Sequence, residues 1–228
     1  MTRIKKFKLG VLGAQGRMGR EISTLLLEPR FFARLESVDS PFSAEAVLDF
    51  ASPAAVLEYC REALRRKVSV PLVVGSTGWT EAELRELDAA AVAFPILRAA
   101  NFSLGIQICK MTLANWKSLP SLANWRVSIR DLHHAGKKDA PSGTALSLRE
   151  ALGREVKIES IREGEIIGTH EVILENEFET IRLIHEAKSR TVFADGALEA
   201  VLELLNANPA SLPRRLLGLD DLYLRRDA

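Results

Sequence analysis

Short apolar runs alternate with longer stretches of helical spacing over residues 7–98. This alternation is typical of βαβ units on a parallel sheet. The short runs predict strands over residues 7–12, 35–38, 46–50, 69–74 and 93–97. The stretches between them predict helices over residues 17–28, 53–66 and 80–91. Pro29 is expected to end the first helix, and Thr80 with Glu83 forms a capping box that starts the third.

The pattern changes after Asn101. Helices are expected over residues 103–116, 142–152 and 194–206, and strands over 125–132, 156–161 and 170–187. The last two strand segments are rich in β-branched and charged residues, with a turn at 175–177, which indicates antiparallel strands. We therefore predict an α/β protein with a shortened, Rossmann-like parallel-sheet nucleotide domain over 1–102 and 191–228. An α+β domain with a mixed or antiparallel sheet, residues 103–190, is inserted into it.

Three glycines follow the first predicted strand, in the order Gly13-Ala-Gln-Gly16-Arg-Met-Gly19. A dinucleotide-binding turn requires this context between a strand and a helix. Gly13 permits the tight turn, Gly16 lets a pyrophosphate approach backbone N–H groups, and Gly19 allows the helix to pack closely. The spacing is G-x-x-G-x-x-G rather than the commoner G-x-G-x-x-G. A sharp glycine turn that binds no ligand is the alternative interpretation.

The residue after the second strand bears on the choice of cofactor, because an acid there accepts hydrogen bonds from an adenosine ribose. Asp39 stands at this position, and a solvated turn aspartate is an equally good interpretation. A 2′-phosphate would meet Ser40 and Pro41 there, although Arg17 in the glycine turn supplies positive charge. These residues favour NADH over NADPH, or the use of both.

The composition argues against several classes of protein. Lys and Arg number 31 and Asp and Glu 30 among 228 residues, so the formal charge is +1. A basic face for nucleic acid or membranes is therefore not expected. Cys60 and Cys109 are too few for a disulfide framework, which favours a reducing compartment, the cytoplasm. No segment is expected to act as a signal peptide or to span a bilayer.

The densest group of chemically active residues lies between Asp131 and Thr144, where two of the four histidines and two lysines precede a helix start. The backbone N–H groups of Ser142, Gly143 and Thr144 are expected to point outward there as an anion site. With Lys137 beside them the site favours a carboxylate, and an adjacent histidine can deliver a proton near neutrality. A solvated surface loop before a well-capped helix is the alternative.

Other chemistries find less support in the sequence. No metal site is expected, because adjacent His133 and His134 project differently and no carboxylate pair recurs at ligand spacing. His170 and His185 lie in predicted strands, where a packed or hydrogen-bonded histidine is expected. Neither G-x-S-x-G nor a phosphate loop ending in Gly-Lys-Ser/Thr occurs, which excludes hydrolase and kinase interpretations.

Five stretches, in order along the chain, resemble the dihydrodipicolinate reductase family of bacterial diaminopimelate and lysine biosynthesis. They are Gly13-Ala-Gln-Gly-Arg-Met-Gly19, Asp49-Phe-Ala-Ser-Pro53, Gly75-Ser-Thr-Gly78, Ala100-Asn-Phe-Ser-Leu-Gly105 and His133-His-Ala-Gly-Lys-Lys-Asp-Ala-Pro-Ser-Gly-Thr-Ala145. Three shorter stretches extend the match: Arg162-Glu-Gly164, Gly168-Thr-His170 and Ser189-Arg-Thr-Val-Phe193. The resemblance covers nearly the whole chain, and the block that begins at His133 is its most specific part.

The resemblance implies that NADH or NADPH reduces a cyclic, unsaturated dicarboxylate, dihydrodipicolinate or 4-hydroxy-tetrahydrodipicolinate, to tetrahydrodipicolinate. By position it makes His133 and Lys137 catalytic, as proton donor or relay. The residues that it assigns to the substrate are His134, Ser142, Gly143 and Thr144. The residues that it assigns to the cofactor are Gly13, Gln15, Gly16, Arg17, Met18, Asp39, Phe50, Gly75, Ser76, Thr77, Ala100, Asn101, Phe102, Arg190 and Phe193.

The resemblance also implies a homotetramer, with domain 103–190 binding the substrate and its strand-rich part supplying the subunit contacts. The chain departs from the family in two places. The segment between Asp39 and Ala46 is shorter than usual, and Ser52 stands where relatives that also accept NADPH can have Arg. A dinucleotide-binding sensor without turnover and a related amino-acid dehydrogenase are the alternatives. The intact His133 and Lys137 argue against a sensor.

Overall fold

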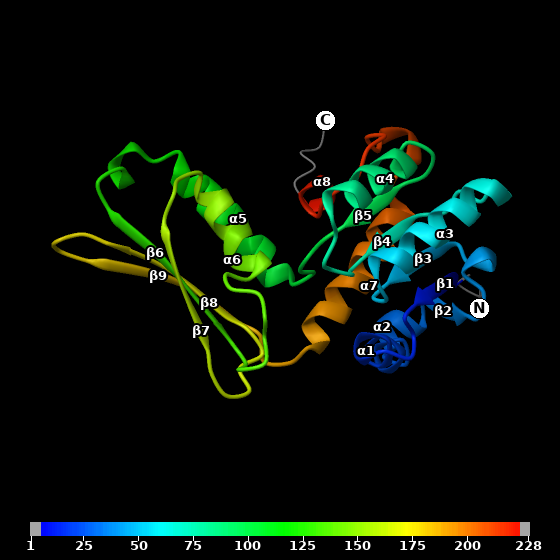
Figure 1. The fold of residues 1–228 in the computed structure, drawn as a ribbon, viewed down its shortest axis with the longest axis horizontal. Coiled ribbons are helices and arrows are strands. Elements are labelled where there is room, and N and C mark those ends of the chain that lie inside the picture. The colour runs from blue at the N-terminus through cyan, green and yellow to red at the C-terminus, as the bar shows by residue number, and fades with distance from the viewer. Residues whose placement is uncertain (1–5, 224–228) are drawn as a thin grey trace. The chain divides into compact units, whose positions relative to one another are not determined.

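The computed structural model describes residues 6–223, and the chain forms two compact units (Figure 1). The first unit joins the residues up to Phe102 with those from Phe193 onward, and the second spans Ser103–Val192. Each unit has its own sheet and its own hydrophobic core. Among the described residues, no helix is both long and apolar enough to cross a membrane.

The first unit is built on a parallel sheet in the order β2-β1-β3-β4-β5 (Figure 1). Its strands are β1 (Phe7–Leu12), β2 (Leu35–Val38), β3 (Ala46–Asp49), β4 (Leu72–Val74) and β5 (Ile96–Arg98). The predicted parallel sheet is confirmed. β4 and β5 begin later than the apolar runs indicate, because Pro71 and Pro95 precede them and have no N–H for the ladder. The strand order reverses between β1 and β3, and such a switch point is where doubly wound sheets bind ligands.

The helices of the first unit are α1 (Arg17–Leu25), α2 (Pro29–Phe32), α3 (Pro53–Arg66), α4 (Glu81–Ala91), α7 (Thr191–Asn206) and α8 (Asp220–Tyr223). The capping box of α4 is confirmed, since Thr80 Oγ accepts the N–H of Glu83 and the Glu83 carboxylate accepts that of Thr80. The expected end of the first helix is wrong. α1 stops at Leu25, and Pro29 starts α2, because proline suits the first position of a helix.

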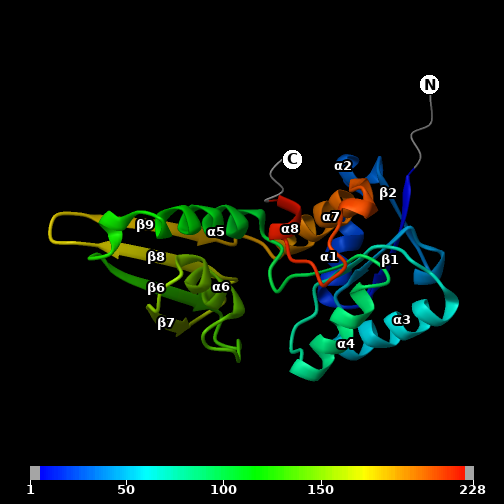
Figure 2. The same cartoon turned by 90° about the horizontal axis from the view of Figure 1, so that it is seen from above.

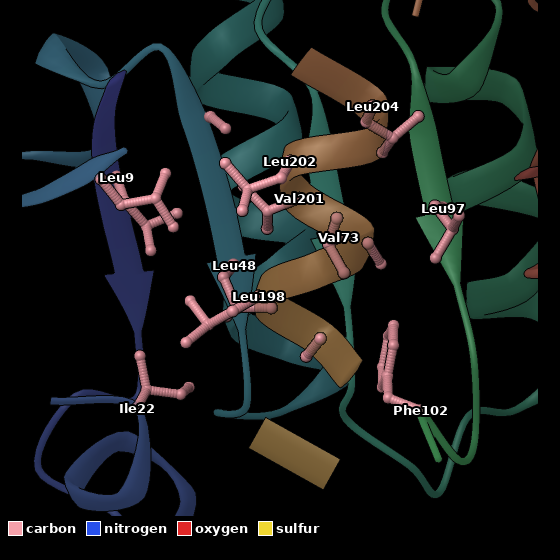
Figure 3. Packing of buried hydrophobic residues seen from close by; sticks show 14 of the residues in the cluster. Leu9, Ile22, Leu48, Val73, Leu97, Phe102, Leu198, Val201, Leu202 and Leu204 are labelled. Carbon is pink, nitrogen blue, oxygen red and sulfur yellow. The ribbon is translucent and has the colours of Figure 1, made fainter. Parts of the chain in front are cut away.

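Helices cover both faces of this sheet, as the alternating directions of strand side chains require (Figure 2). One face packs against α1 and α7 through a cluster that includes Leu48, Val73, Leu97, Ile22, Leu198 and Val201 (Figure 3). The other face packs against α3 and α4 through a cluster that includes Val47, Leu72, Ile96, Val56 and Leu87. The sheet is therefore the buried middle layer of three.

The connection from β2 to β3 crosses β1 without a helix. It consists of residues 39–45 and contains one 3-10 turn, η1 (Pro41–Ser43). So short a crossing is possible because β2 ends where β3 begins: Val38 pairs with Gly10, and Ala46 pairs with Leu9. A Cβ at Gly10 would lie 2.8 Å from the Cα of Pro41, so glycine lets the turn lie against the strand. This is the structural form of the shortened segment after Asp39.

The second unit is a four-stranded sheet in the order β7-β6-β8-β9, with α5 and α6 packed on one face (Figure 2). Its strands are β6 (Arg126–His133), β7 (Lys157–Arg162), β8 (Thr169–Glu175) and β9 (Thr180–Glu186). Its helices are α5 (Leu104–Lys117) and α6 (Gly143–Leu152). The core between helices and sheet includes Leu113, Ile129, Leu148 and Val172.

The directions of these strands confirm one expectation and correct another. The antiparallel pair over 170–187 is confirmed as the β8–β9 hairpin. The expectation of an antiparallel strand at 156–161 is wrong, because β7 pairs parallel with β6. The physical reason is that α6 lies between β6 and β7 in the chain, and a helical crossover brings the second strand back in the same direction. The sheet is therefore mixed.

Candidate functional site

The glycine turn lies between β1 and α1, at the switch point of the first sheet. Gly13 has a φ of +83°, and its carbonyl accepts the N–H of Gly16 at 2.9 Å, which closes the turn. A Cβ at Gly19 would lie 2.3 Å from the Ala14 carbonyl oxygen. Gly16 is the N-cap residue of α1, and no side chain caps this helix. The first N–H groups of α1 are therefore placed to bind a phosphate.

The loops that follow β3 and β4 meet beside this turn. A Cβ at Gly13 would lie 2.9 Å from the Phe50 carbonyl, and a Cβ at Gly75 would lie 2.4 Å from the Phe50 ring. Asp49 is fully buried and accepts the N–H of Ser76 at 3.2 Å, which joins the two loops. Burial raises the pKa of the Asp49 carboxyl. The first unit thus brings the glycine turn, Phe50 and Gly75 into contact.

The other residues assigned to the cofactor fall mostly at strand ends of the first unit. Asp39 follows β2 directly and is exposed, as are Gln15 and Arg17 in the glycine turn. Thr77 follows β4, the residues Ala100, Asn101 and Phe102 follow β5, Met18 lies in α1, and Phe193 lies in α7. Arg190 differs from all of these, because it belongs to the second unit. Its binding of the cofactor stays a prediction.

Asp131 is the centre of a polar cluster in the second unit, and its side chain is fully buried. Its Oδ1 accepts the Ser142 hydroxyl at 2.7 Å and lies 3.0 Å from His133 Nδ1. Its Oδ2 accepts the N–H of Ser142 at 2.8 Å and the Arg162 guanidinium at 2.9 Å. Burial opposes ionisation, yet these contacts outweigh it and hold the pKa of Asp131 well below its usual range.

Three histidines form a row across the same sheet. The strand register pairs Asp131 on β6 with His170 on β8, and His170 with His185 on β9. The ring centroids of His133 and His170 are 5.1 Å apart, and those of His170 and His185 are 6.0 Å apart. His185 Nε2 lies 2.9 Å from Ser103 Oγ. Burial lowers the pKa of His170 to about 3, so its ring is neutral near pH 7. The expectation of packed or hydrogen-bonded histidines is confirmed.

The start of α6 is fastened to this cluster. Ser142 is the N-cap residue, and its Oγ accepts the N–H of Ala145 at 3.2 Å. The expectation that the N–H of Ser142 points outward is wrong, because the buried carboxylate of Asp131 accepts it. Gly143 and Thr144 follow as the first helical residues. Their binding of an anion, and a substrate contact of Ser142, stay predictions.

The loop between β6 and α6 carries Lys137 and His134. Lys137 Nζ pairs with Asp139 Oδ1 at 2.8 Å, and the Lys137 N–H donates to the His134 carbonyl at 3.1 Å. Arg162 on β7 donates to the Asp139 carbonyl at 2.6 Å as well as to the carboxylate of Asp131. One guanidinium thus ties the lysine loop to the buried carboxylate.

The cluster contains a grouping that the sequence-based argument against a metal did not anticipate. One ligand atom from each of Asp131, His133 and His170 lies within 4.8 Å of the others. The Arg162 guanidinium, 2.9 Å from Asp131, opposes a cation at this place, and both donors of Ser142 already occupy the carboxylate. The expectation of no metal stays a prediction.

Asp131, Arg162 and His170 are not assigned to the site from the sequence. A usable signal exists for Asp131, because it stands two residues before His133 in a predicted strand, which places both on one face. His170 and Arg162 need the register of β6 with its two neighbours, which pairs them with Asp131 and His133 respectively. No pattern within one strand gives that register.

Comparison with known proteins agrees with this geometry. A family model described as dihydrodipicolinate reductase, C-terminus, matches residues 105–222, and one described as dihydrodipicolinate reductase, N-terminus, matches residues 29–102. The chain is 36% identical over 206 residues to a 4-hydroxy-tetrahydrodipicolinate reductase from Thermosipho africanus, covering 87% of this chain and 92% of the relative. It is 35% identical over 232 residues to the protein of that name from Xanthomonas campestris pv. campestris strain 8004, covering 90% and 94%.

The fold also has a solved counterpart. The structure of a dihydrodipicolinate reductase from Paenisporosarcina sp. TG-14, with dipicolinate bound, superposes with a TM-score of 0.72 at 18% identity. The match covers 95% of this chain and 99% of that one. The two family models together span most of both units. This chain belongs to the dihydrodipicolinate reductase family.

Proposed function

We propose that this chain is a 4-hydroxy-tetrahydrodipicolinate reductase of diaminopimelate and lysine biosynthesis, which reduces its cyclic dicarboxylate to tetrahydrodipicolinate with NADH or NADPH. One observation carries the proposal: the segment from His133 to Thr144 places an imidazole and a helix start against one buried carboxylate, and Arg162 ties the loop that carries an ammonium group to the same carboxylate. In the reduction of a dicarboxylate a proton donor completes the reaction, and a cation and an anion-binding helix end can hold the carboxylates. Relatives with this name support the assignment.

A pyridine dinucleotide fits the first unit. The turn packs so closely that side chains at Gly13 and Gly19 would collide with backbone, and the uncapped start of α1 offers N–H groups to a pyrophosphate. Gly16, Arg17 and Met18 would hold the pyrophosphate. The residues on the nicotinamide side would be Phe50, Gly75, Ser76, Thr77, Ala100, Asn101 and Phe102. When bound, the nicotinamide supplies a hydride.

The substrate would bind through its carboxylates. The backbone of Gly143 and Thr144 at the start of α6 would hold one carboxylate, because N–H groups and the helix dipole favour an anion there. His134 and Lys137, on the loop before the helix, would bind the substrate from the other side. Ser142 contributes by fixing the helix start, since its donors face Asp131.

Proton delivery would fall to His133 and Lys137. The 4-hydroxy substrate first loses water to give the conjugated dihydrodipicolinate. Addition of hydride to one end of its double bond then leaves an electron pair on the conjugated system, and the neighbouring atom takes up a proton. The Lys137 ammonium group would stabilise this negative charge as it develops, and His133 or Lys137 would give the proton. His170 is a poor donor at neutral pH because burial keeps its ring unprotonated.

We propose that NADH is preferred over NADPH. Asp39 is exposed at the end of β2, where it can accept both hydroxyls of an adenosine ribose and would repel a 2′-phosphate. Ser52 supplies no positive charge, and its Oγ is used as the N-cap of α3, where it accepts the N–H of Ala55 at 3.3 Å.

We propose a cytoplasmic homotetramer that assembles through the sheet face left uncovered by α5 and α6 within the second unit. Arg130 and Glu171 form an ion pair at 3.2 Å on this face, and Ile184 beside them is 55% exposed. Light scattering should give a mass four times that of the 25.2 kDa chain. A monomer at micromolar concentration would contradict this assembly.

Oxidation of NADH and of NADPH tests the proposed reaction. Each cofactor is mixed with the purified protein and with substrate freshly made by the preceding synthase, beside a control without substrate. Substrate-dependent oxidation, faster with NADH, is expected. If the folded protein binds a dinucleotide but oxidises neither, the sensor interpretation replaces the reductase. A panel of 2-oxo acids with ammonia tests for an amino-acid dehydrogenase in the same assay.

A further inference from the structure

We propose that Asp131 is a positioning residue for proton delivery: its carboxylate fixes the His133 ring through Nδ1, leaves Nε2 for the substrate, and holds the start of α6 at the same time. The inference rests on the proposed function, in which His133 meets the substrate. It adds a residue that does not itself touch substrate or cofactor. The carboxylate is fully buried within the second unit.

The geometry assigns different tasks to the two ring nitrogens of His133. Nδ1 lies 3.0 Å from Asp131 Oδ1. An ionised carboxylate accepts hydrogen bonds but donates none, so we infer from this separation that a neutral ring carries its proton on Nδ1, the nitrogen nearer the carboxylate. Nε2 is the nitrogen left for chemistry. A Cβ at Gly168 would lie 3.1 Å from Nε2, so the absence of a side chain there leaves space beside this atom.

The charges around the ring make Asp131 the anion in contact with it. The charged and titratable groups around His133 include Asp131 on β6, Arg162 at the paired position on β7, and His170 on β8. His185 on β9 and Lys137 on the loop interact in turn with His170. Burial keeps His170 and His185 neutral near pH 7. The carboxylate of Asp131 is the anion in direct contact with the ring, 3.0 Å from Nδ1, so we infer that it fixes the orientation of His133.

The carboxylate of Asp131 also fixes the position of the start of α6, which is the proposed anion-binding end of the site. Asp131 accepts both the N–H and the hydroxyl of Ser142, the N-cap residue of α6. Loss of the carboxylate should therefore act on the proton donor and on the substrate's carboxylate together. A buried carboxylate with only a structural role would change stability without changing either one.

The first test needs no substitution of Asp131. Long-range 1H–15N correlation spectra of the wild-type protein, recorded where the histidines are neutral, distinguish a ring protonated on Nδ1 from one protonated on Nε2. The His133 signals are identified by their absence from the His133→Gln variant. We expect His133 to carry its proton on Nδ1. A ring protonated on Nε2 would overturn the proposal, whether or not the protein reduces the substrate.

The second test compares kcat and KM of wild type and Asp131→Asn. Loss of the carboxylate releases the His133 ring from its position, so kcat should fall about tenfold or more. KM should rise as well, because the start of α6 loses its anchor. Asp131→Glu, which keeps the charge, should restore part of kcat.

Glu171→Gln is the matched control. Glu171 is also buried and paired with arginines, Arg130 at 3.2 Å and Arg182 at 3.5 Å, but it lies next to His170 in sequence and on the opposite face of the sheet. Its substitution should leave kcat close to that of the wild type. An unchanged kcat in Asp131→Asn, or an equal fall in Glu171→Gln, would refute the positioning role. If Asp131→Asn does not fold, the ring spectrum of the wild type decides.

Discussion

The two units build their sites from different material. In the first unit the turn at Gly13, Gly16 and Gly19 works through backbone, because each glycine lets main-chain atoms come closer than a side chain would allow. In the second unit side chains from neighbouring strands converge on Asp131. A backbone site depends on the absence of Cβ atoms, whereas a side-chain site depends on the pairing of strands. The same kind of substitution should therefore have different effects in the two units.

The largest expected effect is at the side-chain site. His133→Gln removes the proposed proton donor and should lower kcat by about 10²–10⁴-fold. Because the glycine turn belongs to the other unit, NADH affinity measured by fluorescence titration should stay unchanged. Loss of both activity and NADH binding would indicate misfolding instead. Full activity of this variant would leave Lys137 as the proton donor.

The next largest effect is expected at the backbone site, the glycine turn of the first unit, where a substitution should weaken cofactor binding. Gly19→Ala places a Cβ 2.3 Å from the Ala14 carbonyl oxygen, so the turn must shift. Overpacking of this kind costs about 1–3 kcal/mol, and the displaced N–H groups should lower NADH affinity by about tenfold or more. Gly218→Ala is the matched control, because a Cβ there meets no atom within 4 Å. Unchanged NADH affinity in Gly19→Ala would contradict the role given to the turn.

The third prediction is that acid lowers the stability of the second unit, through its buried residue His170. The pKa of His170 is lowered to about 3 in the folded chain, below its ordinary value of 6.5. Between these values the unfolded chain binds the extra proton, so stability is full above pH 6.5 and falls as the pH drops toward 3. The loss is about 1.4 kcal/mol per pH unit for this group. Urea unfolding from pH 6.5 to 4.5, followed by tryptophan fluorescence, measures it, since two of the three tryptophans, Trp116 and Trp125, lie in the second unit.

His170→Gln provides the control for this acid effect. It removes the group that must take up the proton, so the slope of unfolding free energy against pH should decrease. Part of the remaining slope should come from His185, whose pKa is also lowered by burial. An unchanged slope would show that His170 is not buried in its neutral form.

The smallest effect concerns the adenosine end of the cofactor. Asp39→Asn removes a charged acceptor, and hydrogen bonds to charged groups contribute about 1.5–3 kcal/mol. Because Asp39 is exposed, the lower end applies, and the dissociation constant for NADH should rise about tenfold. NADPH binding should change less, or improve, since the variant no longer repels a 2′-phosphate. An equal loss for both cofactors would place Asp39 away from the ribose.

The sequence predicted the fold correctly where the signal comes from residues close together in the chain. α3 begins at Pro53 and ends at Arg66, as the apolar spacing and the proline predict. The glycine turn and the capping box at Thr80 are likewise set by residues close together in the chain. The end of α1 was predicted wrongly, because Pro29 can stop one helix and start another.

The second unit's site depended on contacts that a local pattern does not contain. His133 and Lys137 stand in one recognisable segment, but His170 reaches Asp131 only through the pairing of β6 with β8. The direction of β7 has the same origin, since crossover topology and not strand composition decides it. The prediction of an outward N–H at Ser142 was wrong, because this N–H donates to the carboxylate of Asp131, which lies on another element, β6.

The late position of α7 in the chain has a consequence for synthesis on the ribosome. β1 to β5 are complete at Arg98, yet α7, which covers the face bearing Leu48 and Val73, begins only at Thr191. The whole second unit is translated in between. During that interval α1 covers this face without α7, the part that α7 covers later stays exposed, and exposed apolar surface of this kind promotes aggregation. Nascent chains should therefore depend on chaperones until α7 has emerged.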